Sequence, residues 1–245
     1  MAREDSEPTK IDAYLQLAEW YAQPLGRQLA EEHSNRLAPV LSGLFGYHLL
    51  QVGGYFGNMV QHTSIRHCVK VSPALPTDLV ALPEALPIAT DSVDVVLLAH
   101  TLEIDPRPHQ VLREVERVLI PEGSVVILGF NPWSLMGLWR WLPTLRAGMP
   151  LSGQFFSLSR IRDWLTLLDF EVTHTEFFFY RPPVSSEILL RKLRFIEPMG
   201  QRFFYQQGGT YIVVARKRVV TLTPLRRKKV TARRVLAPGY AHRGG

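Results

Sequence analysis

The chain contains one cysteine among its 245 residues, and it has no long apolar run. Cys68 therefore cannot form an internal disulfide, which favours a reducing compartment. No run reaches the roughly 18 apolar residues that a membrane-spanning helix needs. The polar start, Met1–Lys10, also lacks the apolar core of a signal peptide. These absences predict a cytoplasmic protein without a spanning segment.

Several catalytic motifs are missing as well. His, Cys and Asp do not occur at the spacing that is typical of a zinc site. The chain has neither a phosphate-binding P-loop nor the Gly-x-Ser-x-Gly turn that carries a nucleophilic serine. We therefore expect no metal site, and the sequence gives no support to the hydrolases that depend on these two motifs.

Acidic residues are absent from the C-terminal end. Ten of the 28 Lys and Arg residues lie after residue 215, where there is no Asp or Glu. The preceding residues carry the other 18 bases and all 22 acids, a net charge of −4. A basic tail over residues 218–245 can attract nucleic acid or an anionic membrane surface. A solvated, disordered terminus is the alternative that this composition favours.

The first part of the chain has a helical pattern. Apolar residues recur at helical spacing between Ile11 and Leu44, and Pro24 and Pro39 are expected to divide this stretch. Residues 1–44 are therefore predicted to form an N-terminal helical extension. The hydrophobic fraction of 46% is sufficient for a sizeable core in one domain.

Short apolar runs then alternate with helical segments, which is typical of an α/β fold with a parallel sheet covered on both faces. The helices are expected at 108–120 and 159–168. The two late runs are expected to close the sheet with an antiparallel edge. The predicted strands are 48–52, 67–71, 78–81, 93–99, 124–130, 171–180 and 210–215.

Several motifs occur in the order and spacing of one superfamily. Residues 84–87 (EALP), 91–96 (DSVDVV) and 112–123 (LREVERVLIPEG) resemble class I S-adenosylmethionine-dependent methyltransferases with a type 11-like domain. Residues 156–172 and 210–217 extend this resemblance. Residues 48–50, 97–102 (LLAHTL) and 129–137 (GFNPWSLMG) are similar to its YafS-like bacterial branch.

The resemblance implies a Rossmann-like, doubly wound sheet of seven strands with an antiparallel last strand. It places the methyltransferase domain at 45–217, with insertions at 131–153 and 181–209. It also implies S-adenosylmethionine as cofactor and methyl transfer as the reaction.

A glycine-rich turn follows the first predicted strand. In a parallel sheet the ligand crevice lies outside the carboxyl ends of the strands, and glycine lets backbone approach a ligand closely. A tight turn without a ligand is the alternative. Together with the resemblance, this position predicts the following cofactor contacts: Gln51, Gly53, Gly54, Tyr55, Gly57, Ser72, Leu82 and His100.

Four of these positions depart from the family pattern. Gln51 replaces an acid, and Tyr55 replaces the middle glycine of the turn. Ser72 and Leu82 stand where the family has acids that bind the ribose and the adenine amine. A charge-assisted hydrogen bond contributes about 1.5–3 kcal/mol, so these losses predict a lower affinity unless other groups compensate.

His100, at the end of the fourth predicted strand, is the best candidate for a catalytic base, if the acceptor must lose a proton. A packing or capping role for His100 is an equally weighted alternative. Glu103 and His109 are weaker candidates, expected to cap a turn and to lie in the first turn of a helix. Asn131 either borders the acceptor site or forms a turn.

Two segments indicate an apolar acceptor. Residues 133–150 contain three tryptophans, with Arg140 and Arg146 as their only charges, and residues 189–195 are basic and amphipathic. Such segments suit a lid over a small hydrophobic acceptor or an interfacial helix. A helix packed on the domain is the alternative for the first segment, and it is slightly favoured.

Three functions therefore stay open. The first is an S-adenosylmethionine-dependent methyltransferase acting on a small, apolar molecule. The second is a catalytically silent methyltransferase fold used for binding or regulation, which the missing acids suggest. The third is a protein associated with nucleic acid through its basic tail.

Overall fold

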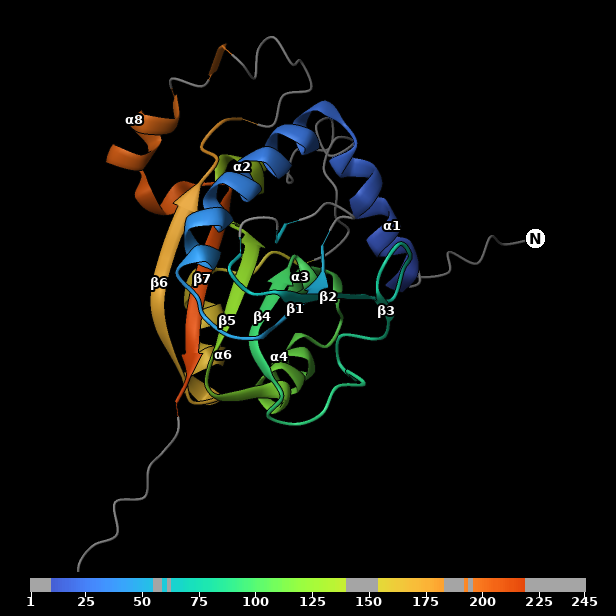
Figure 1. Cartoon of the computed structure of the whole chain (residues 1–245). Helices are drawn as coiled ribbons and strands as arrows, with labels where there is room; N and C mark the ends of the chain where they lie inside the picture. Colours follow the sequence, from blue (N-terminus) through green and yellow to red (C-terminus); the bar gives the residue numbers. More distant parts are fainter. Residues whose placement is uncertain are drawn as a thin grey trace, which may run out of the picture.

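A computed structural model describes residues 10–54, 59–60, 63–139, 154–182, 192–193 and 196–218 (Figure 1). These residues form one seven-stranded sheet in the order β3-β2-β1-β4-β5-β7-β6. β7 is antiparallel to both of its neighbours, and the other pairs are parallel. The predicted Rossmann-like fold is thus confirmed. The strands are β1 (His48–Gly53), β2 (His67–Ser72), β3 (Leu79–Val80), β4 (Val93–Ala99), β5 (Leu119–Phe130), β6 (Phe170–Phe178) and β7 (Thr210–Lys217).

The strand order reverses between β1 and β4. The chain runs outward from β1 to β3 and then returns to β4, which pairs with the other side of β1. In this pairing Gly53, the last residue of β1, is opposite Ala99, the last residue of β4. Open α/β sheets bind ligands at such a reversal, outside the carboxyl ends of the strands. The fold therefore places the glycine turn and His100 together at this reversal.

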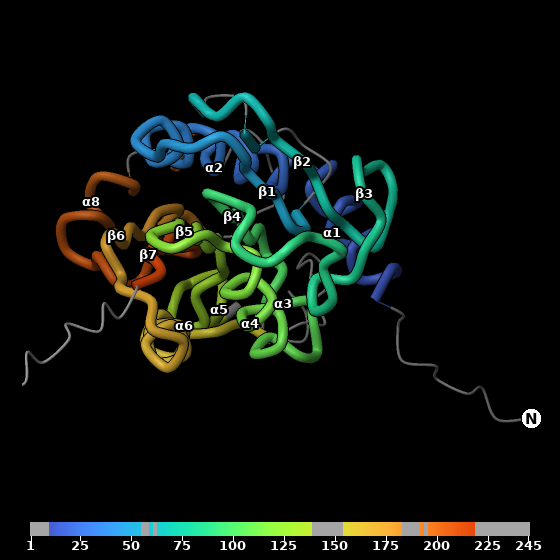
Figure 2. Tube along the Cα trace, turned by 60° about the horizontal axis from the view of Figure 1, so that its bottom comes forward, coloured from blue at the N-terminus to red at the C-terminus, as the bar shows by residue number. Residues whose placement is uncertain are grey.

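Helices cover both faces of the sheet. Figure 2 shows α1 and α2 on one face and α4 and α6 on the other. Successive strand residues enter opposite cores: Leu49 and Leu97 pack with α1 and α2, whereas Leu50 and Val96 pack with α4 and α6. The helical segments are α1 (Lys10–Tyr21), α2 (Pro24–Ser42), α3 (Thr101–Ile104), α4 (Pro108–Val118), α5 (Leu135–Trp139), α6 (Leu158–Leu167), α8 (Ile196–Phe203) and the 3₁₀ turn η3 (Tyr205–Gln207).

Two local expectations were wrong. Pro24 begins α2 as expected, but Pro39 lies inside the helix instead of breaking it. Leu37 and Leu41 on either side are completely buried, so packing on the sheet offsets the hydrogen bond that a proline cannot donate. Strand β5 begins at Leu119 and not at Ser124. Leu119 already pairs with Val93 of β4, and the pairing register shifts between Val93 and Val95, so residues 120–123 are included in the strand.

Some predictions fall outside the described residues. They concern residues 140–153 of the tryptophan-rich segment, all of the basic amphipathic segment 189–195 except residues 192 and 193, and the tail after Arg218. Arg218 itself pairs with Glu171, with 2.7 Å between Nη2 and Oε1. None of the helices in the described part of the chain has the length and apolarity needed to cross a membrane.

Candidate functional site

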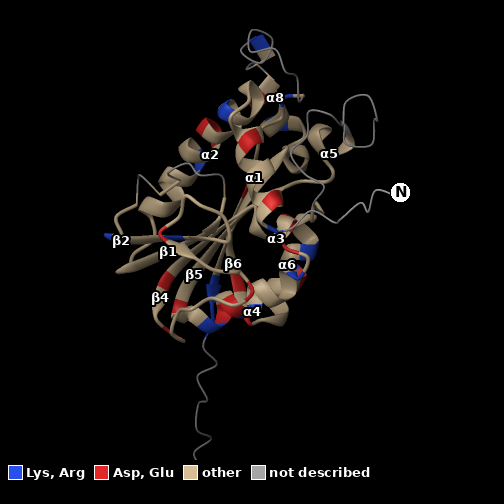
Figure 3. Ribbon diagram, turned by 90° about the vertical axis from the view of Figure 1, so that its right-hand side faces the viewer, with Lys and Arg blue, Asp and Glu red and all other residues tan. Residues whose placement is uncertain are grey.

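The N-terminal helix α1 covers the carboxyl ends of β1 and β4, next to α3 (Figure 3). Its buried side chains are Tyr14, Leu17, Trp20 and Tyr21. A Cβ atom on Gly53 would lie 3.1 Å from the Tyr14 ring, so α1 packs directly on the glycine turn. Burial, and then the neighbouring carboxylates, raise the pKa of Tyr14, which keeps its hydroxyl protonated. The predicted helical extension thus forms one wall of the candidate site.

The glycine turn requires its glycines for two reasons. Gly53 and Gly54 have φ angles of 71° and 92°, which side-chain-bearing residues rarely adopt. A Cβ on Gly53 would also lie 2.6 Å from the hydroxyl oxygen of Thr101. That hydroxyl donates a hydrogen bond of 2.6 Å to the carbonyl of Val52, so it has little freedom to move. Two predicted contacts of the same turn, Tyr55 and Gly57, lie outside the described residues.

Gln51 precedes this turn and is 2% exposed. Its side-chain amide donates a long hydrogen bond of 3.4 Å to the Gly53 carbonyl. Its carbonyl oxygen, Oε1, is buried and has no hydrogen-bond partner in the described part of the chain. A buried acceptor without a partner costs stability, so a ligand ammonium at this position fits the residues that are present.

The positions expected to contact adenosine offer few free hydrogen-bonding groups. The Ser72 hydroxyl accepts a hydrogen bond from the backbone of Ala74 at 3.2 Å, and Leu82 is 43% exposed beyond the end of β3. Asp78 cannot replace the missing acid, because its carboxylate accepts the Lys70 backbone N–H at 2.8 Å. The adenosine half of the site therefore departs from the family pattern in structure as well as in sequence.

A charged cluster lies beside the turn, and the sequence alone did not reveal it. Lys10 of α1 contacts both Glu84 and Asp105, with 3.2 Å between Nζ and Asp105 Oδ2. Arg107 donates to Glu84 Oε1 at 2.7 Å and, through its backbone, to Asp105 Oδ1 at 2.8 Å. The second Glu84 oxygen, Oε2, is buried without a hydrogen-bond partner among the described residues. The motif at 84–87 contains Glu84, but no local signal could place Lys10 next to it.

The two carboxyl groups of this cluster shift in opposite directions. Burial alone would raise the pKa of Glu84, but hydrogen bonds with Lys10, then with Asp105 and the backbone, and finally with Arg107 prevail and lower it to about 2. Burial raises the pKa of Asp105, and the neighbouring Glu84 carboxylate adds to this effect. The cluster therefore holds one firmly ionised carboxylate next to one that resists ionisation.

His100 is completely buried at the end of β4, and its φ angle of 54° is unusual for a residue with a side chain. Its Nε2 is hydrogen-bonded to the Tyr21 hydroxyl at 2.8 Å. Its ring stacks on Phe130 with 4.1 Å between the ring centres. The other nitrogen, Nδ1, lies 3.7 Å from Glu103 Oε1, which is too far for a hydrogen bond, and it has no partner among the described residues.

A second buried imidazole stands near His100. The ring centres of His33 and His100 are 5.2 Å apart. Burial, and then the proximity of His100, lower the pKa of His33 well below its ordinary value. His33 is therefore uncharged at neutral pH, so the side of His100 that faces His33 is aromatic and carries no charge.

The comparisons with known proteins agree with this geometry. Residues 55–127 match the methyltransferase domain family. The protein YafS of Escherichia coli K12 is 37% identical over 216 residues, which cover 86% of this chain and 85% of YafS. The chain belongs to the YafS family, within the class I methyltransferase superfamily.

Solved structures share this fold at low identity. A Haloferax volcanii chain in complex with the Trm112 methyltransferase activator has a TM-score of 0.60 at 15% identity, over 84% of this chain and 98% of its own. A methyltransferase of Thermotoga maritima gives 0.57 at 18%, over 84% and 92%. The geranyl diphosphate C-methyltransferase of Streptomyces coelicolor, solved with S-adenosyl-L-homocysteine, gives 0.51 at 14%, over 76% and 79%.

The weaker candidates have structural roles in this YafS-family chain. Glu103 accepts the Phe130 backbone N–H at 2.8 Å and so fixes the end of β5. The Asn131 amide donates to the carbonyls of Gln206 and Gly208 at 2.8 and 3.0 Å, and its oxygen accepts the Trp133 N–H. His109 lies in the first turn of α4, with its ring 4.2 Å from that of Trp164. Asn131 thus forms the turn, and His109 lies where it was expected.

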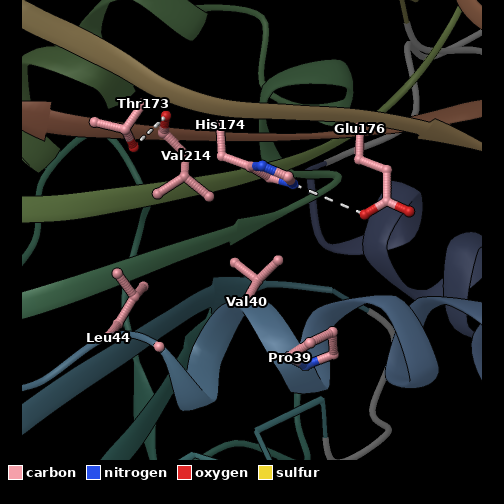
Figure 4. Close-up of a pocket in the computed structure, with 8 residues that line it drawn as sticks. Pro39, Val40, Leu44, Thr173, His174, Glu176 and Val214 are labelled. Carbon is pink, nitrogen blue, oxygen red and sulfur yellow. Dashed lines mark hydrogen bonds and ion pairs between the residues drawn. The ribbon is translucent and has the colours of Figure 1, made fainter.

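The YafS-family chain also has a pocket away from this site. A cavity of about 400 Å³ lies between the end of α2 and strands β6 and β7 (Figure 4). Pro39, Val40 and Leu44 line it from the helix. Its polar groups already have partners: the Thr173 hydroxyl donates to the Val214 carbonyl, and Glu176 binds Arg36. None of the predicted site residues lines this pocket.

Proposed function

We propose that this chain is an S-adenosylmethionine-dependent methyltransferase that acts on a small, apolar acceptor. The observation that carries the proposal is the position of three buried polar atoms without hydrogen-bond partners in the described chain: Gln51 Oε1, Glu84 Oε2 and His100 Nδ1. All three lie near the reversal point between β1 and β4. Such atoms are rare in folded proteins, and their clustering supports a polar ligand at this place.

Each of these atoms fits a group of the cofactor or of the acceptor. Gln51 Oε1 would accept a hydrogen bond from the methionine ammonium, while Gly53 and Gly54 let backbone approach. Glu84 Oε2 would accept from a hydroxyl or amine of the adenosine half, where Ser72 and Leu82 offer no acid. When bound, the cofactor supplies a methyl group that its sulfonium already activates. The protein has to align the acceptor and exclude water.

His100 is the group proposed to take a proton from the acceptor. For Nδ1 to accept that proton, Nε2 must carry the ring hydrogen and donate it to the Tyr21 oxygen. The hydrogen bond between Tyr21 and His100 would then select the tautomer that leaves Nδ1 as a base. Glu103, 3.7 Å away, would stabilise the imidazolium that forms.

Aromatic surfaces around His100 support an apolar acceptor. Phe130 stacks on His100, and Phe155 stacks on Phe130 with 5.1 Å between ring centres. Trp20 meets the edge of the same ring at 6.4 Å. Binding sites for small molecules are mostly apolar with a few well-placed polar groups, which is the arrangement present here.

Thermal unfolding with and without S-adenosylmethionine or S-adenosyl-L-homocysteine tests the proposal. A ligand at about 100 times its Kd adds about 2.7 kcal/mol, a rise in Tm of roughly 5–10 °C for a chain of this size. Gln51→Leu is expected to reduce this rise. Gln154→Leu, at an exposed glutamine, is the matched control and should keep it. No rise for the wild-type protein at millimolar ligand would contradict the proposal.

A catalytically silent binding protein is the second candidate. This candidate is supported because the polar groups that could hold adenosine already interact with the protein. Ser72 caps a turn, and Lys10 and Arg107 neutralise Glu84. The two candidates differ in one result. An enzyme transfers labelled methyl groups from S-adenosylmethionine to small molecules of a cell extract, whereas a silent protein gives no transfer.

The third reading, association with nucleic acid, involves the tail and not this site. Its test is RNA or DNA binding that falls steeply with salt and disappears when the residues after Lys217 are deleted.

A further inference from the structure

Four apolar side chains are exposed in the segment that runs from α8 into η3. Met199, Phe203, Phe204 and Tyr205 have 53%, 67%, 54% and 49% of their surface exposed. We call these four side chains the aromatic patch. Single exposed apolar residues are common, but a run of three adjacent aromatic residues marks a binding surface.

The aromatic patch is held in a fixed orientation by the opposite side of the same segment. Gly200 packs so closely on Tyr180 that a Cβ atom would lie 2.3 Å from its ring. Glu197 accepts hydrogen bonds from Arg181 at 2.8 Å and from the Tyr180 backbone at 3.1 Å. The Tyr205 hydroxyl donates to the Thr175 carbonyl at 2.9 Å. These contacts fix the inner face, so Met199 and Phe203 must face outward.

Exposed basic side chains accompany the aromatic patch. Among the described residues, Arg202 of α8 and Lys192, shortly before this helix, are exposed. The single acid of α8, Glu197, is turned inward and is neutralised by Arg181. A partner with an apolar interior and a negatively charged surface would match exposed aromatic and basic side chains. A bilayer that contains anionic lipids has both properties.

The aromatic patch lies at the end of the molecule that contains the carboxyl ends of β4 and β5, whereas β7 ends on the opposite side (Figure 1). Figure 3 shows α5 at the same end as α8. Trp133 and Leu138 of that region are 77% and 63% exposed. Hydrogen bonds from Asn131 to Gln206 and Gly208 tie the two regions together. A membrane contacted by α8 would therefore lie at the end of the sheet where the candidate site is located.

We propose that the protein docks peripherally on an anionic lipid surface through the aromatic patch and Arg202. Aromatic side chains insert at the level of the headgroups, and the arginine pairs with lipid phosphates. This docking does not depend on cofactor binding, so its test is independent of the test of the methyltransferase proposal. It also differs from any electrostatic attraction of the basic tail, because it requires apolar insertion.

Flotation of the full chain with vesicles tests the inference. The vesicles contain either phosphatidylcholine alone or equal parts of phosphatidylcholine and phosphatidylglycerol. The test variant is Phe203→Ser with Phe204→Ser. Its matched control is Phe45→Ser with Tyr47→Ser, which removes two aromatic residues that are 84% and 77% exposed outside the aromatic patch. All four side chains are largely exposed, so Tm should change little in either variant.

We expect the wild-type protein and the control to bind the anionic vesicles, and the test variant to bind more than about tenfold more weakly. Arg202→Glu should weaken binding to the anionic vesicles as well. Equal binding by the test variant and the control would overturn the inference and assign any attraction to the tail. Failure of the wild-type protein to bind either vesicle would overturn it too, and would favour a protein partner for this surface.

Discussion

The hydroxyl of Tyr21 and Nε2 of His100 are hydrogen-bonded at 2.8 Å, although the residues are 79 positions apart in the sequence. Both side chains are buried. This contact joins α1 to the end of β4 and connects the N-terminal helix with the histidine that is the best candidate for a catalytic base. Removing either partner should therefore affect both stability and the candidate site.

Tyr21→Phe leaves Nε2 of His100 buried without its partner. The free energy of unfolding should fall by about 1–3 kcal/mol, the usual cost of a buried polar group that loses its hydrogen bond. Urea unfolding monitored by fluorescence measures it. Tyr47→Phe, at a tyrosine that is 77% exposed, is the control and should leave stability unchanged. Equal stability of the wild-type protein and Tyr21→Phe would show that this hydrogen bond contributes nothing.

Gly53→Ala places a side chain where φ is 71° and where its Cβ would lie 2.6 Å from the Thr101 hydroxyl. Stability should fall by about 1–3 kcal/mol. The rise in Tm with cofactor should also disappear if the turn binds the methionine moiety. Gly43→Ala is the matched control, because φ is −83° there and the nearest atom would be 3.5 Å away. The control should be neutral or stabilising by up to about 1 kcal/mol.

Stability should depend on pH through His33. Its pKa in the folded protein is lowered well below the ordinary 6.5 by burial and by His100, so the unfolded chain binds the proton more readily. This contribution to stability is complete above pH 6.5 and is lost as the pH falls from there toward the folded pKa. The slope reaches at most about 1.4 kcal/mol per pH unit for one proton.

Unfolding free energies of wild-type protein and His33→Gln at several pH values test this dependence. The variant should show a shallower loss below pH 6.5, because Gln does not titrate. His174→Gln, whose side chain is half exposed, should keep the wild-type slope. Parallel curves for the wild-type protein and His33→Gln would assign the acid sensitivity to other groups.

Local sequence patterns predicted the sheet well. The apolar run of β4 and the helical spacing of apolar residues in α4 predicted the ends of both elements to within two residues. Both patterns follow from the regular geometry of the strand and helix backbone. Gly53 and Gly54 were also predictable, since only glycine adopts their φ angles readily. Pro39 and the start of β5 were not predictable. At Pro39 packing on the sheet overrides the effect of the proline, and at the start of β5 a shift in the pairing register with β4 lets the strand begin earlier.

The candidate site was predicted only in part. Gln51 and His100 were placed at the ends of β1 and β4 because parallel strands end at one edge of a sheet. The charged cluster beside the glycine turn was not foreseen. Glu84 and Asp105 meet Lys10 from 74 and 95 positions away, and no short-range pattern encodes this meeting.

The sequence by itself determined the order of strands and helices, the glycine turn, and the likeness to methyltransferases. These follow from backbone geometry and from short motifs, whose physical requirements are local. The tertiary structure alone decided which polar groups face one another: Tyr21 with His100, Lys10 with Glu84, and Gln51 Oε1 with no partner in the described chain. It also decided that α1 closes over the reversal point of the sheet. Such relations depend on how distant elements pack, and packing is a property of the whole chain.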